Sequence, residues 1–271
     1  MRNVWISAIA ITLGAIWIAV VTLKPASTQN ATYRAPRTPD GKADLNGIWE
    51  AVNTANWDIQ DHAARQGPVM ALGASFSVPA GISVVEGNDI PYKPEALAKK
   101  KENADNWLTQ DPEIKCYMAG VPRATYEGYP FQIVQTPNYI LMAYEFASAS
   151  RTIYMDSKSE SPADTWMGWS NGHWEGDTLV VDAKSFNNKT WFERAGNYHS
   201  DALHVIERYT PIDATHLQYE ATIEDPKVFT RPWKISMPLY KRMEKNMQLL
   251  EYKCVEFVEE LMYGHLRKKS Q

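Results

Sequence analysis

Apolar and polar positions alternate with a period of two through most of the second half of the chain. Turn sequences such as Thr-Pro-Asn, Glu-Gly-Asp and Pro-Ile-Asp-Ala interrupt the alternation. The alternating runs are 130–146, 151–156, 172–186, 204–225, 229–240 and 248–257. Because successive side chains of a strand point to opposite faces, this spacing predicts a mainly β fold of short antiparallel strands. A closed β-barrel fits first, and a β-sandwich is the alternative.

Two segments depart from this alternation. Residues 93–108 contain strong helix formers, with Pro94 where a first helical turn tolerates it, and therefore predict a helix. Residues 255–266 predict a short closing helix. Glycine and proline punctuate residues 60–90, which predicts loops with short elements. No run alternates a strand with a long helix, so the sequence argues against a parallel α/β sheet.

The chain begins with an uninterrupted apolar segment, residues 4–23, that carries no charge. A spanning helix needs about 20 apolar residues, whereas the apolar core of a signal peptide has about 7–15. We therefore predict that residues 1–23 are an uncleaved signal anchor, a single transmembrane helix, with a cleaved signal peptide as the alternative. Residues 24–44 are a proline-containing linker, 45–264 a single β-rich extracytoplasmic domain, and 265–271 a basic tail.

This order places the protein in the cell inner membrane, single-pass, with most of the chain in the periplasm. Secretion after cleavage is the alternative. The formal net charge of −4 gives no electrostatic case for nucleic-acid binding, which depends on basic surfaces. The predicted partners are the lipid bilayer, through residues 4–23, and either a small-molecule ligand or a membrane protein complex.

Cysteine and aromatic content refine this picture. Cys116 and Cys254 are the only cysteines, and an even count in an exported chain predicts one disulfide, with two buried thiols as the alternative. Neither lies in a CxxC motif or at zinc-finger spacing, and nucleotide motifs are missing, so we predict no metal site and no cofactor. Ten Trp and fourteen Tyr residues suit pocket walls and interfaces as well as cores.

Two kinds of resemblance follow from short motifs. Gly47-Ile48-Trp49 is similar to the Gly-x-Trp that opens the first strand of lipocalin-like barrels, where the indole plugs one barrel end. PDGKADLNGIWE, KCYMAGVPRATY and HSDALHVIERYT resemble motifs of an uncharacterised family of exported bacterial proteins, and the likeness covers Pro39 to Gly264. The resemblance implies export and a barrel architecture but no mechanism, and the N-terminal anchor lies outside it.

The stretch HSDALHVIERYT holds the first candidate for chemistry. On a strand, His199 and Asp201 share one face and can act as an oriented imidazole and carboxylate, whereas His204 points the other way. The two histidines therefore cannot form a paired metal site on regular backbone. The alternative is that His199-Ser200-Asp201 is the turn before strand 203–209, with Asp201 capping backbone groups.

The stretch VPRATYEGYP, bracketed by Pro122 and Pro130, holds the second group of candidate site residues. Arg123 can clamp a carboxylate or phosphate through two parallel hydrogen bonds, and Tyr126 can donate to an oxygen of a ligand. Alternatively, Arg123 pairs with Glu127 or Asp111 at the barrel rim. Both readings remain open from sequence.

Three further residues are ligand-binding candidates together with Arg123: Glu145, Trp174 and Arg231. If strand 139–146 buries Tyr144, Glu145 lies on the opposite face, where it lines a pocket or faces solvent.

Two functions fit these observations. The first is a membrane-tethered barrel with a Trp/Tyr-lined pocket for a small, partly apolar molecule. His199, Asp201 and Tyr126 would then carry cofactor-free acid–base chemistry of an isomerase or lyase type. The alternative is a non-enzymatic, single-span accessory subunit that docks on a larger membrane protein complex.

Overall fold

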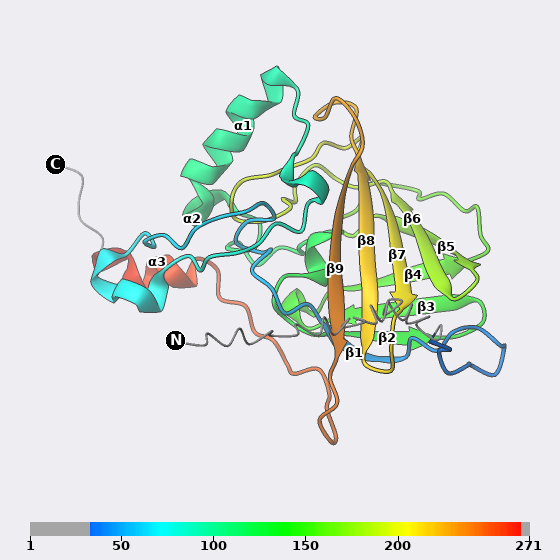
Figure 1. Cartoon of the computed structure of the whole chain (residues 1–271). Coiled ribbons are helices and arrows are strands. Elements are labelled where there is room, and N and C mark those ends of the chain that lie inside the picture. Colours follow the sequence, from blue (N-terminus) through cyan, green and yellow to red (C-terminus); the bar gives the residue numbers. More distant parts are fainter. Residues whose placement is uncertain (1–32, 267–271) are drawn as a thin grey trace, which may run out of the picture. The chain divides into compact units, whose positions relative to one another are not determined.

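The computed structural model describes residues 33–266, and nine strands of this region close into one barrel in chain order (Figure 1). The strands are β1 (Gly47–Glu50), β2 (Phe131–Gln135), β3 (Tyr139–Tyr144), β4 (Ser150–Met155), β5 (Trp169–Glu175), β6 (Thr178–Lys184), β7 (His204–Pro211), β8 (His216–Glu224) and β9 (Trp233–Lys241). The predicted mainly β fold is confirmed, and the architecture is the barrel, not the sandwich.

Short helices lie outside the barrel. The α-helices are α1 (Pro94–Asp105), α2 (Trp107–Gln110) and α3 (Val258–Tyr263), and the 3₁₀ segments are η1 (Met70–Phe76), η2 (Glu86–Asn88), η3 (Arg123–Thr125), η4 (Phe146–Ser148) and η5 (Gly264–Leu266). The helices predicted in 93–108 and near the C-terminus are therefore present. Pro94 occupies the first turn of α1, as its missing N–H allows.

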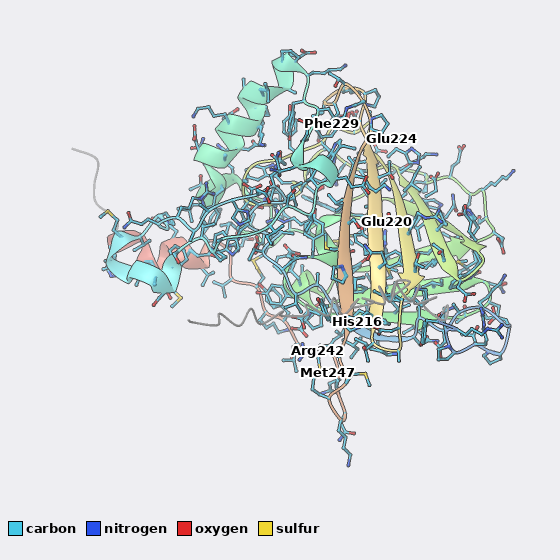
Figure 2. The ribbon with its side chains drawn as sticks, in the orientation of Figure 1. His216, Glu220, Glu224, Phe229, Arg242 and Met247 are labelled. Atoms are coloured by element: carbon cyan, nitrogen blue, oxygen red, sulfur yellow. A yellow bond between two sulfur atoms is a disulfide. The ribbon has the colours of Figure 1, made fainter. Side chains whose placement is uncertain are left out.

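Alternation explains the barrel wall directly. In β8, Leu217, Tyr219, Ala221 and Ile223 are buried in the barrel interior. Figure 2 labels His216, Glu220 and Glu224 along the same strand, which belong to the outward-facing set. One face of the strand therefore supplies the core and the other is only partly covered, as a period of two requires.

The structure corrects two strand predictions. First, β4 and β5 are parallel, with Ile153 opposite Ser170, because residues 156–168 carry the chain back to the end of the barrel where β4 began. Second, residues 248–257 do not form a strand. Strand β9 already pairs with β1 through Trp49 and Lys241, so the closed barrel leaves 248–257 no edge to join.

The chain after β9 instead forms an irregular C-terminal segment, residues 242–266, that runs from the end of β9 to α3 (Figure 1). The predicted disulfide between Cys116 and Cys254 is confirmed, with Cα atoms 5.7 Å apart. It ties this segment to the loop that precedes β2.

The Gly-x-Trp triplet opens β1. The φ of Gly47 is +145°, and a Cβ there would lie 2.6 Å from Cε of Lys241, so glycine permits the close approach of that lysine. The ammonium of Lys241 lies 5.3 Å from the ring centroid of Trp49. Trp49 is buried and donates from Nε1 to the carbonyl of Leu45 at 2.9 Å.

A buried ion pair crosses the barrel lumen. Nη1 of Arg151 on β4 lies 2.7 Å from Oε2 of Glu207 on β7. The hydroxyls of Tyr209 and Tyr219 each donate to Oε1 of Glu207 at 2.8 Å. Nη2 of Arg151 donates to the Tyr209 hydroxyl at 3.2 Å. Charges and tyrosine side chains thus occupy the middle of the lumen.

No helix within residues 33–266 is long and apolar enough to span a membrane. The predicted anchor, residues 1–23, lies outside the described residues, as do the first part of the predicted linker and residues 267–271 of the predicted basic tail.

Candidate functional site

A cluster of buried, charged side chains lies between the segment that precedes β2, residues 111–127, and Arg194. We call Asp111, Glu113, Arg123, Glu127 and Arg194 the Arg123 cluster. The first four residues are buried, and the side chain of Arg194 is 14 % exposed. These residues come from loops and from η3, so tertiary packing alone brings them together.

Arg123 is fully engaged inside this cluster. Nη1 and Nη2 donate to the two carboxylate oxygens of Asp111 at 2.7 and 2.9 Å. Nη2 also donates to Oε2 of Glu113 at 2.7 Å, and Nε donates to Oδ1 of Asn56 at 2.9 Å. The alternative predicted from sequence, pairing with Asp111, is therefore what the structure shows. A guanidinium so occupied has little capacity left to clamp a ligand.

Glu113 links the two arginines. Arg194 donates from Nε and Nη2 to Oε2 and Oε1 of Glu113 at 2.8 and 2.6 Å. Burial opposes a charge on Glu113, but Arg194 and Arg123 outweigh burial and lower its pKa to about 2. The guanidinium of Arg194 also lies over the rings of Trp57 and Trp107, 4.5 and 5.2 Å from their centroids. Glu113 therefore stays ionised at neutral pH, held between two cations.

Glu127 behaves in the opposite way. Its two carboxyl oxygens are buried and have no hydrogen-bond partner among the described residues, and the nearest charge is Nε of Arg123 at 3.8 Å. Burial, and then the negative charge of Glu113, raise the pKa of Glu127 well above its usual range. The cluster thus contains one carboxylate kept charged and one carboxyl group biased to keep its proton. Pairs pushed apart in this way are typical of functional sites.

A pocket of about 170 Å³ opens beside this cluster, between it and the C-terminal segment; we call it the C-terminal pocket. Tyr129, Phe146 and Tyr252 form an aromatic wall, with ring centroids 5.0 to 5.6 Å apart. Glu113 and Arg194 supply the charged side. The rest of the lining is Ile114, Lys253, Cys254, Val255, Val258 and Glu259.

Strained backbone surrounds the C-terminal pocket. Cys116, Ala147 and Phe257 have φ values of +58°, +55° and +53°, in the left-handed region that non-glycine residues avoid. Each such residue costs about 1–3 kcal/mol and persists only when its surroundings impose it. The N–H of Phe257 donates to the carbonyl of Ile114 at 2.9 Å, which fixes the C-terminal segment against the pocket wall. The three strained residues lie close to the pocket, which indicates that the surrounding structure holds the pocket in a fixed shape.

A larger hollow of about 720 Å³ lies on the outer face of β5 and β6. Size alone would favour it as the main site. Its charged residues are exposed, however, whereas the buried ion pair of Glu113 and Arg194 lines the C-terminal pocket. Because chemistry depends on such perturbed groups, we take the C-terminal pocket as the candidate functional site.

His199 and Asp201 lie in the turn before β7, not on a strand, so the turn alternative is correct. His199 is buried; Nδ1 donates to the carbonyl of Ser200 at 2.8 Å and Nε2 accepts from the hydroxyl of Thr190 at 2.5 Å. Burial lowers the pKa of His199, in agreement with a neutral ring. Asp201 is exposed and pairs with Nζ of Lys227 at 2.6 Å. The hydrogen bond from Lys227 lowers the pKa of Asp201, and backbone hydrogen bonds at Asp201 and Ala202 also lower it, as its predicted capping role requires. Asp225 accepts from the N–H of Ser200 at 2.6 Å.

Tyr126 is buried, and its hydroxyl donates to the carbonyl of Phe192 at 3.0 Å. Strand β3 ends at Tyr144, so Glu145 does not continue the strand that was predicted to orient it. Its Oε2 instead accepts from the N–H of Leu250 at 2.8 Å and holds the C-terminal segment. Glu145 is therefore close to the candidate site as an anchor, whereas Tyr126 contributes to core hydrogen bonding.

Trp174 lies on β5 and packs partly buried against the barrel core. Arg231 is exposed, and its Nη2 pairs with Asp89 at 2.8 Å. Neither residue lines the C-terminal pocket or the larger hollow. The predicted site residues are therefore dispersed over the molecule, and only the surroundings of Arg123 and Glu145 coincide with the candidate site.

Sequence reasoning missed Glu113, Arg194, Tyr129 and Tyr252. One signal was available: a bridge between Cys116 and Cys254 places Tyr252 near Glu113. Nothing in the spacing of residues links Arg194 to that region.

In the described part of the chain, no group of three or more His, Cys, Asp or Glu residues is arranged to hold a metal ion. Comparison with known proteins found no matching family model and no matching curated sequence.

Proposed function

We propose that the protein binds a small, neutral, partly aromatic molecule in the C-terminal pocket. The observation that carries this proposal is the aromatic wall of Tyr129, Phe146 and Tyr252 facing the compensated charges of Glu113 and Arg194. Mostly apolar walls with a few fixed polar groups are typical of small-molecule sites.

The pocket sets the size of the ligand. At about 170 Å³ it is near the volume of a cavity that holds one benzene ring, about 150 Å³. A single substituted aromatic ring fits, whereas a drug-sized molecule does not.

Charge sets its polarity. Arg194 already forms two hydrogen bonds with Glu113, and Glu259 lies 3.9 Å from the same guanidinium. A ligand carboxylate would face the carboxylates of Glu113 and Glu259, and Lys253, the other cation of the lining, lies 2.7 Å from the carboxylate of Glu251. Burial and the neighbouring Tyr129 raise the pKa of Tyr252, so its hydroxyl stays protonated and can hydrogen-bond a neutral hydroxyl group.

Binding of phenol, measured by ligand-observed NMR on the full-length chain, tests the proposal. Val258 lines the pocket from α3, so Val258→Trp fills it from the solvent side. Leu261→Trp is the matched control, because Leu261 lies on the same helix, is 69 % exposed and is absent from the lining. We expect phenol binding at least about tenfold weaker in Val258→Trp, about 1.4 kcal/mol, and unchanged in Leu261→Trp.

Benzoate provides the charge test and should bind more weakly than phenol. Failure of phenol to bind the wild-type chain, or equal binding by both tryptophan variants, would contradict the proposal. Stronger binding of benzoate than phenol would contradict the assignment of a neutral ligand.

Export to the periplasm and tethering by residues 4–23 are part of the same proposal. The apolar N-terminal sequence supports them, and so does the Cys116–Cys254 disulfide, since such bonds persist mainly in oxidising compartments. Alkaline phosphatase fused after residue 271 should be active in a bacterial host and remain with the membrane fraction; an inactive fusion would argue against export.

A lipocalin-like character for the barrel is also proposed here. It is supported by the position of Gly47-Ile48-Trp49 at the start of β1 and by the buried indole of Trp49 near the seam with β9. The ligand site, however, lies outside the lumen, since Arg151 and Glu207 occupy the lumen itself.

A further inference from the structure

The larger hollow on the outer face of β5 and β6 has a different character from the C-terminal pocket. We call it the β5–β6 groove; the loop 156–161, which follows β4, forms its other wall. In Figure 1, β5 and β6 lie on the side of the barrel away from α3, so the two hollows are separate. Its volume of about 720 Å³ lies within the range of 300–1,000 Å³ usual for organic ligands.

One aromatic ring provides a platform in this groove. Trp169 lines it and stacks on Tyr154, with ring centroids 4.6 Å apart and planes 17° apart. Nε1 of Trp169 donates to the Ser159 hydroxyl at 3.2 Å, and Nδ2 of Asn171 donates to the Ser159 carbonyl at 2.8 Å. The indole is therefore fixed in orientation by its stacking partner and by the loop.

The polar groups of the groove are numerous, and most of them are uncharged or belong to exposed side chains. Three serines of the loop, Asn171 and His173 contribute neutral donors and acceptors. The lining also holds the charged residues Asp156, Lys158 and Glu160. Nζ of Lys184 lies 3.2 Å from Asp182. Asp182 also contacts Nε2 of His204 at 3.1 Å. No guanidinium lines the groove, so the site lacks the forked donor that phosphate or carboxylate recognition favours.

Backbone conformation indicates that this arrangement is imposed. Asp156 and Ser185 both line the groove, and both have positive φ, +51° and +59°. The N–H of Asp156 donates to the carbonyl of Gly172 at 2.7 Å, which holds the loop to β5. Non-glycine residues with left-handed backbone conformation cluster at binding sites, where the surrounding structure holds them in place.

From these features we propose that the β5–β6 groove binds a neutral saccharide of about two rings. A pyranose presents a face of C–H groups, which packs on an aromatic ring, and a rim of hydroxyls, which hydrogen-bond serine, amide and carboxylate groups. The combination of one oriented indole and several uncharged polar groups matches that chemistry. A mostly apolar ligand would leave these polar groups without partners, which is unfavourable.

The test is isothermal titration of the full-length chain with maltose, cellobiose and N,N′-diacetylchitobiose, each at millimolar concentration, with glucose 6-phosphate as the anionic counterpart. Trp169→Ala removes the platform and should weaken binding of whichever disaccharide binds by about tenfold or more. Trp169→Phe keeps a ring over Tyr154 but loses the hydrogen bond to Ser159, so it should weaken binding less. Tyr240→Ala is the control, because Tyr240 lies on β9, is 38 % exposed and is absent from the groove.

Thermal unfolding of each variant separates loss of the platform from loss of the fold. If Trp169→Ala does not fold, the comparison of Trp169→Phe with Tyr240→Ala decides. Binding that decreases with the ring at position 169, in folded variants, supports the saccharide site. The proposal is overturned if none of the three disaccharides binds, if glucose 6-phosphate binds more tightly, or if folded position-169 variants bind like the wild type. None of these outcomes bears on phenol binding at the C-terminal pocket.

Discussion

The barrel lumen and the Arg123 cluster both bury charges, but they balance them differently. In the lumen, Glu207 is paired with Arg151 and accepts from two tyrosine hydroxyls. In the Arg123 cluster, two arginines are already matched by Asp111 and Glu113, and Glu127 is an additional acid without a hydrogen-bond partner among the described residues.

This difference distinguishes buried charges that support the fold from buried charges that belong to a candidate functional site. A buried ion pair whose two charges balance orders the core around it, although Oε2 of Glu207 and Nε of Arg151 have no hydrogen-bond partner among the described residues. An extra buried carboxyl group carries a free-energy cost that folding alone does not justify. The Arg123 cluster carries that cost beside a pocket, which is why we place the function there.

The largest expected effect comes from breaking the lumen pair. Arg151→Met leaves Glu207 as an unpaired buried charge, so unfolding free energy should fall by about 3–5 kcal/mol in urea denaturation. Adding Glu207→Gln removes that charge while keeping an acceptor for Tyr209 and Tyr219, and should recover at least half of the loss. If the double variant is no more stable than the single one, the lumen pair is not the self-contained structural unit described here.

A smaller, pH-dependent effect should mark Glu127. Its raised pKa means that the folded state holds a proton which the unfolded state releases above about pH 4.5, so this group's contribution to stability falls as pH rises. Glu127→Gln resembles the protonated acid and lacks this dependence. We expect the variant to match the wild type near pH 4.5 and to become steadily more stable than the wild type as pH rises to 7. Urea denaturation at several pH values measures the difference, and a difference that does not change with pH would contradict the assignment.

The smallest effect is expected at Asp201. Asp201→Asn removes an ion pair in which both side chains are exposed, so neither the melting temperature nor phenol affinity should change measurably. Calorimetry and the NMR binding assay measure the two quantities. A large loss of phenol binding would move the functional site away from the Arg123 cluster and back to the turn that contains His199.

The barrel was accessible from sequence because alternation is a local signal. HVIERYT and its neighbours show which residues share a face, and that pattern even places Glu207 inward with Val205 and Tyr209. The parallel pairing of β4 with β5 was not accessible, because the direction of a neighbour depends on the path of residues 156–168. Alternation in 248–257 was misleading for a related reason: a strand also needs an edge to pair with.

The candidate site was much less predictable. Arg123 was recognised from its setting between prolines, but its partners come from separate irregular segments that have no periodicity. Glu127 was a predicted partner for Arg123 and lies 3.8 Å from it, but only the structure reveals that its carboxyl oxygens are buried without a hydrogen bond. Residue type suggests which groups can do chemistry, whereas desolvation, which changes their pKa, is a property of the packed structure.

The seam between β1 and β9 has a consequence for how the chain is made. It joins Trp49 to Lys241, so the cylinder closes only after nearly the whole polypeptide has left the ribosome. Pairings between such distant positions slow folding. Until then the nascent protein exposes two unpaired sheet margins, which can associate with other chains. A chaperone that shields those margins during synthesis would therefore raise the yield of native protein more than any stabilisation of the finished barrel.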